Sequence, residues 1–517
     1  MELLDLPRKL RRLGEGGPAI DTPANTIRFI LDGERHELAN VEPTRTVLQF
    51  LREDLGRKGT KEGCAEGDCG ACTVVLVELN RDGDDVVLRS VNSCIQFLPT
   101  LDGKELLTVE SLGRADSLHP VQQAMVDHHG SQCGFCTPGF VMSLFALYKT
   151  DPKPSRRAID DALAGNLCRC TGYRPIVAAA EAMYDAAADS DWLRQPATRD
   201  QRFAPPTERI EALRALQRDA SLQFTTAGRA FFAPQSGDEL AGLLANHPDA
   251  TLLAGGTDVG LWVTKQHREL ETVIYTGRVA ELNEQRVTAS HIEIGAAVTL
   301  ADAMQVIVAN YPGLEELFLR WASPPIRNAA TLGGNIANGS PIGDSMPALM
   351  VLGASLVLRR GRSRREVLLE DFYLDYQVKD LRPAEFVETV RIPRLGDDVI
   401  VASHKLSKRF DQDISALCNA YRLELDGEIV TEFRMACGGM AATVRRATHC
   451  EAAVTGKPWN EATLEAAGKA LARDFEPISD MRASAGYRQR AAQNLLRRFY
   501  LESRGELAES VYAYGRD

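Results

Sequence analysis

The sequence lacks a long hydrophobic run. No apolar stretch approaches the roughly 18 residues that a membrane-spanning helix needs. The longest one, Pro347 to Leu358, ends at two arginines and predicts a buried strand. Arg11 and Arg12 are followed by a glycine-rich segment, not by the apolar one of a secretory signal. We therefore expect no membrane association, a cytoplasmic location, and a loose tail over residues 1–24.

An excess of positive charge is also missing. Lys and Arg total 60 against 71 Asp and Glu, which gives a formal net charge of −11. No basic face stands out, so we expect no nucleic-acid partner. The hydrophobic fraction of 44% is ordinary for a folded protein, and 517 residues exceed a single core. We expect three or four domains.

Cysteine, in contrast, is plentiful and clustered. Eight of the eleven cysteines lie between Cys64 and Cys170. In a reducing compartment, clustered cysteines are more often metal ligands than disulfide partners. The other three (Cys418, Cys437 and Cys450) are widely spaced, and we expect them to be small buried hydrophobic residues.

Patterning divides the chain into blocks. Alternating residues around a turn at Asp32-Gly33, a helix capped by Thr44 or Thr46, and a strand over 73–79 predict a small α/β domain. A bundle of helices follows, with Thr137 and Pro138 as the N-cap and first turn of one of them. The expected boundaries are 25–110 for the α/β domain, 115–188 for the bundle, 189–220 for a linker, 221–395 for a glycine-rich α+β domain, and 396–510 for a C-terminal α+β domain.

The first cysteine set has a specific spacing. It consists of Cys64, Cys69, Cys72 and Cys94, in the C-x4-C-x2-C…C order of plant-type [2Fe–2S] proteins. Such a cluster needs four converging thiolates and a loop that curls closely around them, which nearby glycines allow. A zinc site with four cysteines remains the alternative.

The second set pairs Cys133 with Cys136, and Cys168 with Cys170. We expect both pairs at helix ends, where facing helix termini bring four thiolates together and N-terminal dipoles stabilise their charge. Because C-x-C spacing is unusual for zinc and the first set lies nearby, a second iron–sulfur cluster is favoured.

Two glycine-rich turns follow strand-like segments. Their Gly-Gly pairs expose backbone N–H groups that can bind a diphosphate. Neither fits G-x-G-x-x-G, so a Rossmann fold is not supported. The two segments contain Leu252, Leu253, Ala254, Gly255, Gly256, Thr257, Asp258 and Val259, and Thr331, Leu332, Gly333, Gly334 and Asn335.

Three strings carry a resemblance: GTKEGCAEGDCGACTV, GSQCGFCTPGF and NLCRCTGYRPI. Together they resemble the iron–sulfur half of the molybdenum hydroxylases, a family that includes xanthine dehydrogenase, aldehyde oxidase and carbon monoxide dehydrogenase. The resemblance implies a multidomain α+β protein with a β-grasp [2Fe–2S] ferredoxin domain, a helical-bundle [2Fe–2S] domain, an FAD-binding domain and a C-terminal flavoprotein domain. It also implies that Gln132 neighbours the molybdenum pterin of a partner.

The glycine-rich segments resemble the flavin domain of the same family, which implies that both line FAD. The resemblance adds Trp321, Asp344 and Lys405 as FAD-contacting positions, with Val387 as a looser match. From the residues alone, Trp321 could equally be core and Lys405 a solvated charge.

By this resemblance, we expect the chain to end where the molybdenum-binding half of the family would begin. This order of domains resembles the small subunit of bacterial two-subunit xanthine dehydrogenases. It implies electron transfer from a molybdenum-binding large subunit through two [2Fe–2S] clusters to FAD and then NAD⁺, no catalytic residue in this chain, and a heterotetramer. Residues 406–413 would border the flavin and influence whether NAD⁺ or oxygen accepts electrons. The alternatives are the same role in aldehyde or N-heterocycle oxidation, and a zinc-stapled interaction scaffold.

Overall fold

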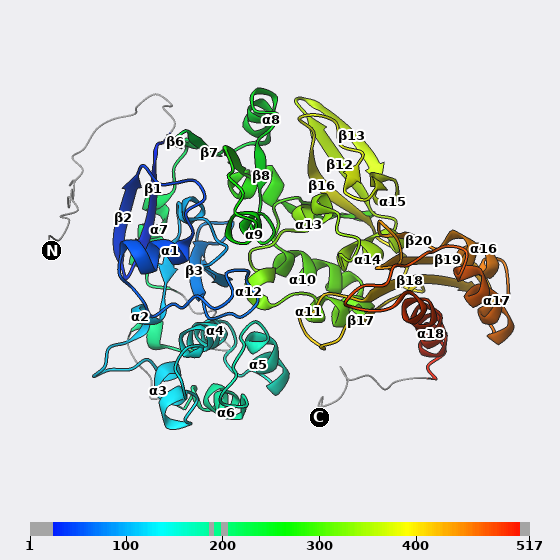
Figure 1. The fold of residues 1–517 in the computed structure, drawn as a ribbon, viewed down its shortest axis with the longest axis horizontal. Helices are drawn as coiled ribbons and strands as arrows, with labels where there is room; N and C mark the ends of the chain where they lie inside the picture. The colour runs from blue at the N-terminus through cyan, green and yellow to red at the C-terminus, as the bar shows by residue number, and fades with distance from the viewer. Residues whose placement is uncertain (1–23, 186–190, 198–204, 507–517) are drawn as a thin grey trace.

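The computed structural model describes residues 24–185, 191–197 and 205–506. The predicted tail lies outside the described residues except for Ala24. Sheets and helices form four successive blocks, from a mixed sheet near the start of the chain to helices near its end (Figure 1).

The first block is a five-stranded sheet in the order β2-β1-β5-β3-β4, in which β1 and β5 are parallel and the other pairs antiparallel. Asp32 and Gly33 both have positive φ, as a tight hairpin turn requires, so the predicted hairpin is confirmed. The Thr46 hydroxyl caps the helix by accepting from Gln49 N at 3.1 Å. The strands are β1 (Thr26–Leu31), β2 (Glu34–Ala39), β3 (Thr73–Leu79), β4 (Val86–Asn92) and β5 (Glu105–Leu107); the short helices are α1 (Val47–Gln49), a π-helix (Phe50–Asp54), a 3₁₀ turn (Leu98–Leu101) and α2 (Val109–Leu112).

The second block is a helical bundle of α3 (Pro120–Asp127), α4 (Thr137–Thr150), α5 (Arg156–Leu163) and α6 (Arg174–Ala182). Helix α4 is central and turns an apolar stripe inward. Its N-cap is Cys136 and not Thr137, which corrects the prediction. The Thr137 hydroxyl instead donates to Ser131 Oγ at 2.8 Å.

The expected linker contains structure that its polar composition does not reveal. Helix α7 (Thr207–Leu216) packs against β3 and β1, and a 3₁₀ turn forms over Trp192–Arg194. Leu213 and Leu216 are buried in the same hydrophobic cluster as the bundle. Because only these few side chains face inward, the segment shows little apolar periodicity in its sequence.

The third block contains two larger sheets, in the orders β6-β7-β9-β8 and β10-β11-β16-β12-β13, and a small sheet of β14 and β15. The stretch 347–358, predicted as a strand, is divided between helix α14 and strand β12, with a turn at Gly353. The strands are β6 (Leu222–Thr226), β7 (Arg229–Ala233), β8 (Thr251–Leu253), β9 (Thr272–Tyr275), β10 (Gln285–Val287), β11 (His291–Gly295), β12 (Ser355–Arg360), β13 (Ser363–Leu368), β14 (Tyr373–Asp375), β15 (Val378–Lys379) and β16 (Phe386–Pro393).

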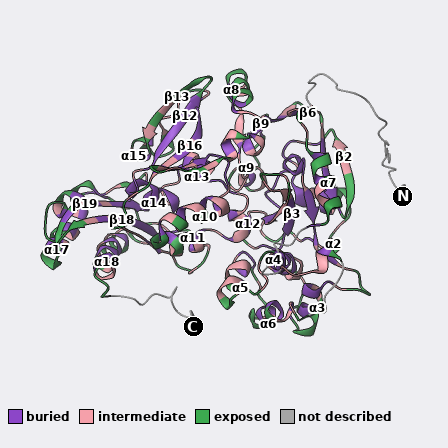
Figure 2. Cartoon of the chain, turned by 180° about the vertical axis from the view of Figure 1, so that it is seen from behind, coloured by how far each residue is buried: buried purple, intermediate pink, exposed green. Residues whose placement is uncertain are grey.

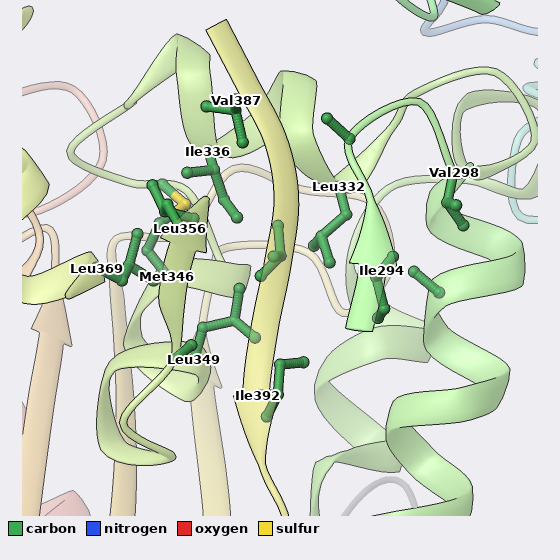
Figure 3. Close-up of a cluster of buried hydrophobic side chains, with 14 of the residues drawn as sticks. Ile294, Val298, Leu332, Ile336, Met346, Leu349, Leu356, Leu369, Val387 and Ile392 are labelled. Carbon is green, nitrogen blue, oxygen red and sulfur yellow. The ribbon is translucent and has the colours of Figure 1, made fainter. Parts of the chain in front are cut away.

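Helices surround both sheets and bury a large core against β16. Figure 3 shows Ile336, Met346 and Leu356 gathered on one side of the long strand in this view, and Leu332 and Ile294 on the other. The helices are α8 (Gly237–Asn246), α9 (Val259–Thr264), α10 (Leu300–Asn310), α11 (Glu315–Arg320), α12 (Pro324–Arg327), α13 (Leu332–Asn338), α14 (Ser345–Val351) and α15 (Leu369–Phe372), with 3₁₀ turns over Thr276–Arg278, Glu281–Asn283 and Pro312–Leu314.

The fourth block is an antiparallel sheet covered by helices. Its order is β17-β18-β19-β20, and α14 of the third block packs on β18 and β19. Cys418, Cys437 and Cys450 are fully buried, as predicted. Figure 2 shows buried residues along these strands and exposed residues on the outer helix α17. The elements are β17 (Ile400–Leu406), β18 (Leu417–Asp426), β19 (Ile429–Gly438), β20 (Arg445–Arg446), α16 (Thr448–Val454), α17 (Glu461–Leu471) and α18 (Ala485–Ser503).

The first and third blocks share one hydrophobic core. Ile27 and Phe29 of β1 belong to the same buried cluster as Phe224, Phe231 and Tyr275. None of the described helices is both long and apolar enough to cross a bilayer.

Candidate functional site

The first cysteine set lies at one end of the β3–β4 hairpin. Cys72 precedes β3 and Cys94 follows β4, and the pairing of Thr73 with Asn92 brings them together. Both are buried, with exposed fractions of 1% and 3%. Cys64 and Cys69 come from the preceding loop, where Cys64 Sγ accepts from the backbone N–H of Cys69 at 3.4 Å.

The thiols of this set contact one another. Hydrogen bonds with Cys69 and Cys94 hold the pKa of Cys64 well below its usual value. Hydrogen bonds to Cys64 in turn raise the pKa of Cys69 and, together with Cys72, that of Cys94. Across the described residues, no group of three or more His, Cys, Asp or Glu has the geometry of a single-ion site. The donor chemistry, four neighbouring sulfurs with N–H groups aimed at one of them, fits a [2Fe–2S] cluster.

The second set forms where α4 begins and where α5 connects to α6. Cys136 contacts Cys168, and Cys133 contacts Cys170. Burial and the bond to Cys168 raise the pKa of Cys136 to about 12. Tyr173 has a φ of 68°, and its hydroxyl accepts from Cys168 N at 3.0 Å. This uncommon backbone conformation therefore places a hydrogen-bond partner beside a cysteine.

Backbone contacts join the two sets. Leu167, next to Cys168, donates its N–H to the carbonyl oxygen of Cys69 at 3.0 Å. Asn166 Nδ2 donates to Gly70 O at 3.0 Å. A β-carbon on Gly70 would lie 2.1 Å from Gly165 O, so no larger residue allows this approach.

The second set is more exposed than the first, in which Cys72 and Cys94 are buried and Cys64 and Cys69 are only partly exposed. Cys133, Cys170 and Gln132 are exposed. Three large hydrophobic side chains beside them are exposed as well, by 46%, 42% and 38%. We call these three residues, Phe135, Leu167 and Tyr173, the rim patch. Exposed hydrophobic side chains grouped around functional residues are typical of an interaction site.

Both glycine-rich turns line one cavity of about 360 Å³, within the size range of small-molecule sites. A β-carbon on Gly255 would lie 1.9 Å from Ala329 O, so the turn packs backbone against backbone. Backbone N–H groups at such turns suit a diphosphate. The predicted residues that line the cavity are Leu252, Ala254, Gly255, Gly256, Thr257, Asp258, Val259, Thr331, Gly333, Gly334, Asn335 and Val387.

The other predicted flavin residues lie outside this lining. Leu253 and Leu332 are buried in the hydrophobic core, and Trp321 packs on Phe318 with ring centroids 6.0 Å apart. Lys405 is buried and donates to Asp344 Oδ2 at 2.5 Å, so it is not a solvated charge. The cavity adds residues that sequence reasoning missed, Trp262, Gln377, Lys379, Glu385 and Phe386, and only the nearness of Trp262 and Phe386 to predicted residues hinted at them.

Helix α9 connects this cavity, which we call the flavin cavity after its expected ligand, to the first cysteine set. It begins at Val259 of the Gly-Gly turn, and a β-carbon on Gly260 would lie 2.7 Å from Ile95 O, next to Cys94. At its other end, Thr264 Oγ1 donates to Ala65 O at 2.7 Å. The helix therefore bridges the cavity and the first set.

The loop 406–413 contacts both the flavin block and the bundle. Arg409 pairs with Asp413 at 2.9 Å, and Gln412 Nε2 donates to Ala164 O at 2.6 Å. Arg320 lies over the Phe410 ring at 4.4 Å. The two cations of this loop are thus held within the chain, since Lys408 donates to Met481 O.

Four family models match the chain in succession. A 2Fe-2S iron-sulfur cluster binding domain matches residues 29–97, and a [2Fe-2S] binding domain matches 108–181. An FAD binding domain in molybdopterin dehydrogenase matches 223–395, and a CO dehydrogenase flavoprotein C-terminal domain matches 402–503. The chain carries the iron–sulfur and flavin domains of a molybdenum hydroxylase. The predicted fold class is confirmed.

Curated relatives of this family are longer. Xanthine dehydrogenase of Emericella nidulans is 33% identical over 92% of this chain, and xanthine dehydrogenase/oxidase of Rattus norvegicus is 32% identical over 88%. The chain spans 38% and 37% of their lengths.

Two solved structures of carbon monoxide dehydrogenases each match about half of the chain. A chain of the carbon monoxide dehydrogenase from Hydrogenophaga pseudoflava superposes with a TM-score of 0.51 and 29% identity. The match covers 54% of this chain and 98% of the other. A chain of a Cu,Mo-CO dehydrogenase gives the same TM-score and coverages at 25% identity. The chain thus has two [2Fe–2S]-binding domains and an FAD-binding domain.

Proposed function

We propose that this chain carries electrons from a molybdenum centre on a partner subunit to NAD⁺, as the iron–sulfur/FAD subunit of a xanthine dehydrogenase. The observation that carries the proposal is the continuous contact from the second cysteine set to the first and on to the flavin cavity. Leu167 joins the two sets, and α9 joins the first set to the cavity. Bound flavin exchanges one or two electrons and so matches one-electron clusters to hydride transfer.

The residues of the chain hold this relay in place. Each set supplies four cysteine ligands: Cys64, Cys69, Cys72 and Cys94 for one cluster, and Cys133, Cys136, Cys168 and Cys170 for the other. The Gly-Gly turns hold the flavin diphosphate. Stopped-flow spectroscopy tests the flavin end: NADH should bleach the flavin and then the clusters, and bleaching by dithionite alone would refute NAD⁺ as the partner of this chain.

The exposed second set and the rim patch support docking of the molybdenum subunit at this face. Gln132, beside Cys133 and exposed, is the proposed pterin neighbour. Gln132→Ala should slow reduction of the clusters by substrate and leave NADH-driven reduction unchanged, whereas exposed Gln123→Ala on α3 should change neither. Slowed NADH-driven reduction alone would contradict this placement.

The proposal also names a substrate and an electron acceptor. The xanthine dehydrogenase relatives favour xanthine, while the structural likeness to carbon monoxide dehydrogenases supports the alternative of another molybdenum hydroxylase. We propose a cytoplasmic location. Copurification with the partner should yield a heterotetramer. Urate formation with NAD⁺ supports the proposal; turnover of aldehydes or N-heterocycles alone favours the alternative, and oxygen consumption matching NADH formation indicates an oxidase.

A further inference from the structure

A second cavity, of about 610 Å³, lies between helix α8 and the β12–β13 hairpin. Figure 1 shows these two elements at the same edge of the flavin block. Four arginines line it, Arg360, Arg364, Arg365 and Arg382, with Glu385 as the one carboxylate in the lining. In a chain with a net charge of −11, this concentration of positive charge is unusual.

Two of the four arginines are already paired. Arg364 binds Glu388 at 2.5 Å, and Arg365 binds Asp380 at 2.6 Å and Glu385 at 2.7 Å. Among the described residues, the side chains of Arg360 and Arg382 have no hydrogen bond or ion pair, and both residues are exposed. The cavity therefore presents two uncommitted guanidinium groups.

The remaining lining is small and apolar. Ala241, Ala245 and Pro248 come from α8 and the residues after it, and Pro383 and Ala384 come from the segment before β16. Side chains this small and apolar leave room for a planar ring. Planar guanidinium groups bind phosphate oxygens through two parallel hydrogen bonds. A molecule that joins a ring to phosphates matches both parts of the cavity.

We propose that this cavity, the arginine cavity, binds a nucleotide. Its base lies against α8, and its phosphates lie on Arg360 and Arg382. The site is separate from the flavin cavity, whose lining contains none of the four arginines. Glu385, held by Arg365, lines both cavities and forms part of the wall between them.

Calorimetric titration of the FAD-loaded chain with ADP tests the proposal. We expect saturable binding that weakens at least about tenfold in Arg360→Gln/Arg382→Gln, because two charge-assisted contacts are lost. Ala245→Trp should block the base wall to a similar extent. Arg362→Gln on the same hairpin and Asn246→Trp on the same helix are matched controls, since both are exposed and lie outside the lining.

The flavin content provides the second measurement. Variants that keep full FAD and a wild-type circular dichroism spectrum but lose ADP binding support the arginine cavity. The proposal is overturned if ADP shows no saturable binding up to the millimolar range, or binds equally to all variants. It is also overturned if the double arginine variant loses FAD, because the cavity then belongs to the flavin diphosphate.

Discussion

The two cysteine sets differ in how far their ligands are exposed. The first has two almost fully buried cysteines and is covered by helix α9 of the flavin block. The second exposes Cys133 and Cys170 beside the hydrophobic rim patch. The donor chemistry is the same, yet the first set has two buried and no exposed cysteines, whereas the second has two exposed and no buried ones. Position in the fold, and not the ligand set, separates the internal end of the proposed relay from its external end.

Removing one cysteine ligand from each set should give the largest difference between the two sets. Cys72→Ser and Cys170→Ser should each remove about two of about four irons per chain, because each cluster has two. Cys72→Ser should also lower the FAD content, since α9 rests against the first set, whereas Cys170→Ser should leave FAD bound. Iron and flavin assays with EPR of the remaining cluster measure both. Equal flavin loss in the two variants would contradict the comparison.

Acid should destabilise the helical bundle that holds the second cysteine set. His119 is fully buried there, and burial lowers its pKa to about 4. Between pH 6.5 and 4 the unfolded chain therefore binds the extra proton, so the free energy of unfolding falls as pH drops, by about 3 kcal/mol in total.

His119→Asn keeps a side chain that can cap α3 but does not titrate in this range. It should flatten the pH dependence of urea unfolding between pH 6.5 and 4. Exposed His128→Asn is the control and should leave the slope unchanged. A wild-type slope in His119→Asn would assign the acid sensitivity to other groups.

Crowding the contact between α9 and the first set should have a smaller effect. In Gly260→Val, the new β-carbon would meet Ile95 O at 2.7 Å, and overpacking of this kind costs about 1–3 kcal/mol. We expect weaker FAD retention with the second cluster intact. Gly242→Ala on α8, where nothing lies within 4 Å, should retain FAD normally. Unchanged FAD affinity in Gly260→Val would show that α9 does not couple the first cysteine set to the flavin cavity.

The smallest effect on the chain itself should come from the rim patch. Phe135→Glu changes an exposed side chain, so its free energy of unfolding should stay within about 0.5 kcal/mol of wild type. Its complex with the molybdenum subunit should nevertheless weaken. Val126→Glu, exposed on α3 of the same bundle, should form the complex normally. Size-exclusion chromatography of the mixed subunits distinguishes the two, and an intact Phe135→Glu complex would place docking elsewhere.

Part of this structure could be predicted because some sequence patterns act over only a few neighbouring residues. The strand over 73–79 and the turn at Asp32-Gly33 were found because alternation and turn residues act over a few positions. An apolar run has no periodicity that separates a strand from a buried helix, so the sequence of 347–358 predicts one strand, whereas α14 and β12 divide it.

Side chains that meet through tertiary packing were harder to find. Lys379 and Glu385 line the flavin cavity only because β15 and β16 pass beside the Gly-Gly turns. The sequence contains five arginines between 359 and 365, but it does not show whether they form a basic face in the folded chain. Which of them are paired depends on carboxylates elsewhere, such as Glu388, and that is a property of the folded chain.

The core shared by β1 and the flavin block also has a consequence for synthesis on the ribosome. Phe29 is made early, but Phe231 and Tyr275 of the same buried cluster emerge much later. At roughly 5–20 residues per second, the interval between Leu107 and Tyr275 takes on the order of 10–30 s. Until then, the first-block residues of this cluster lack the part of their core that the flavin block supplies.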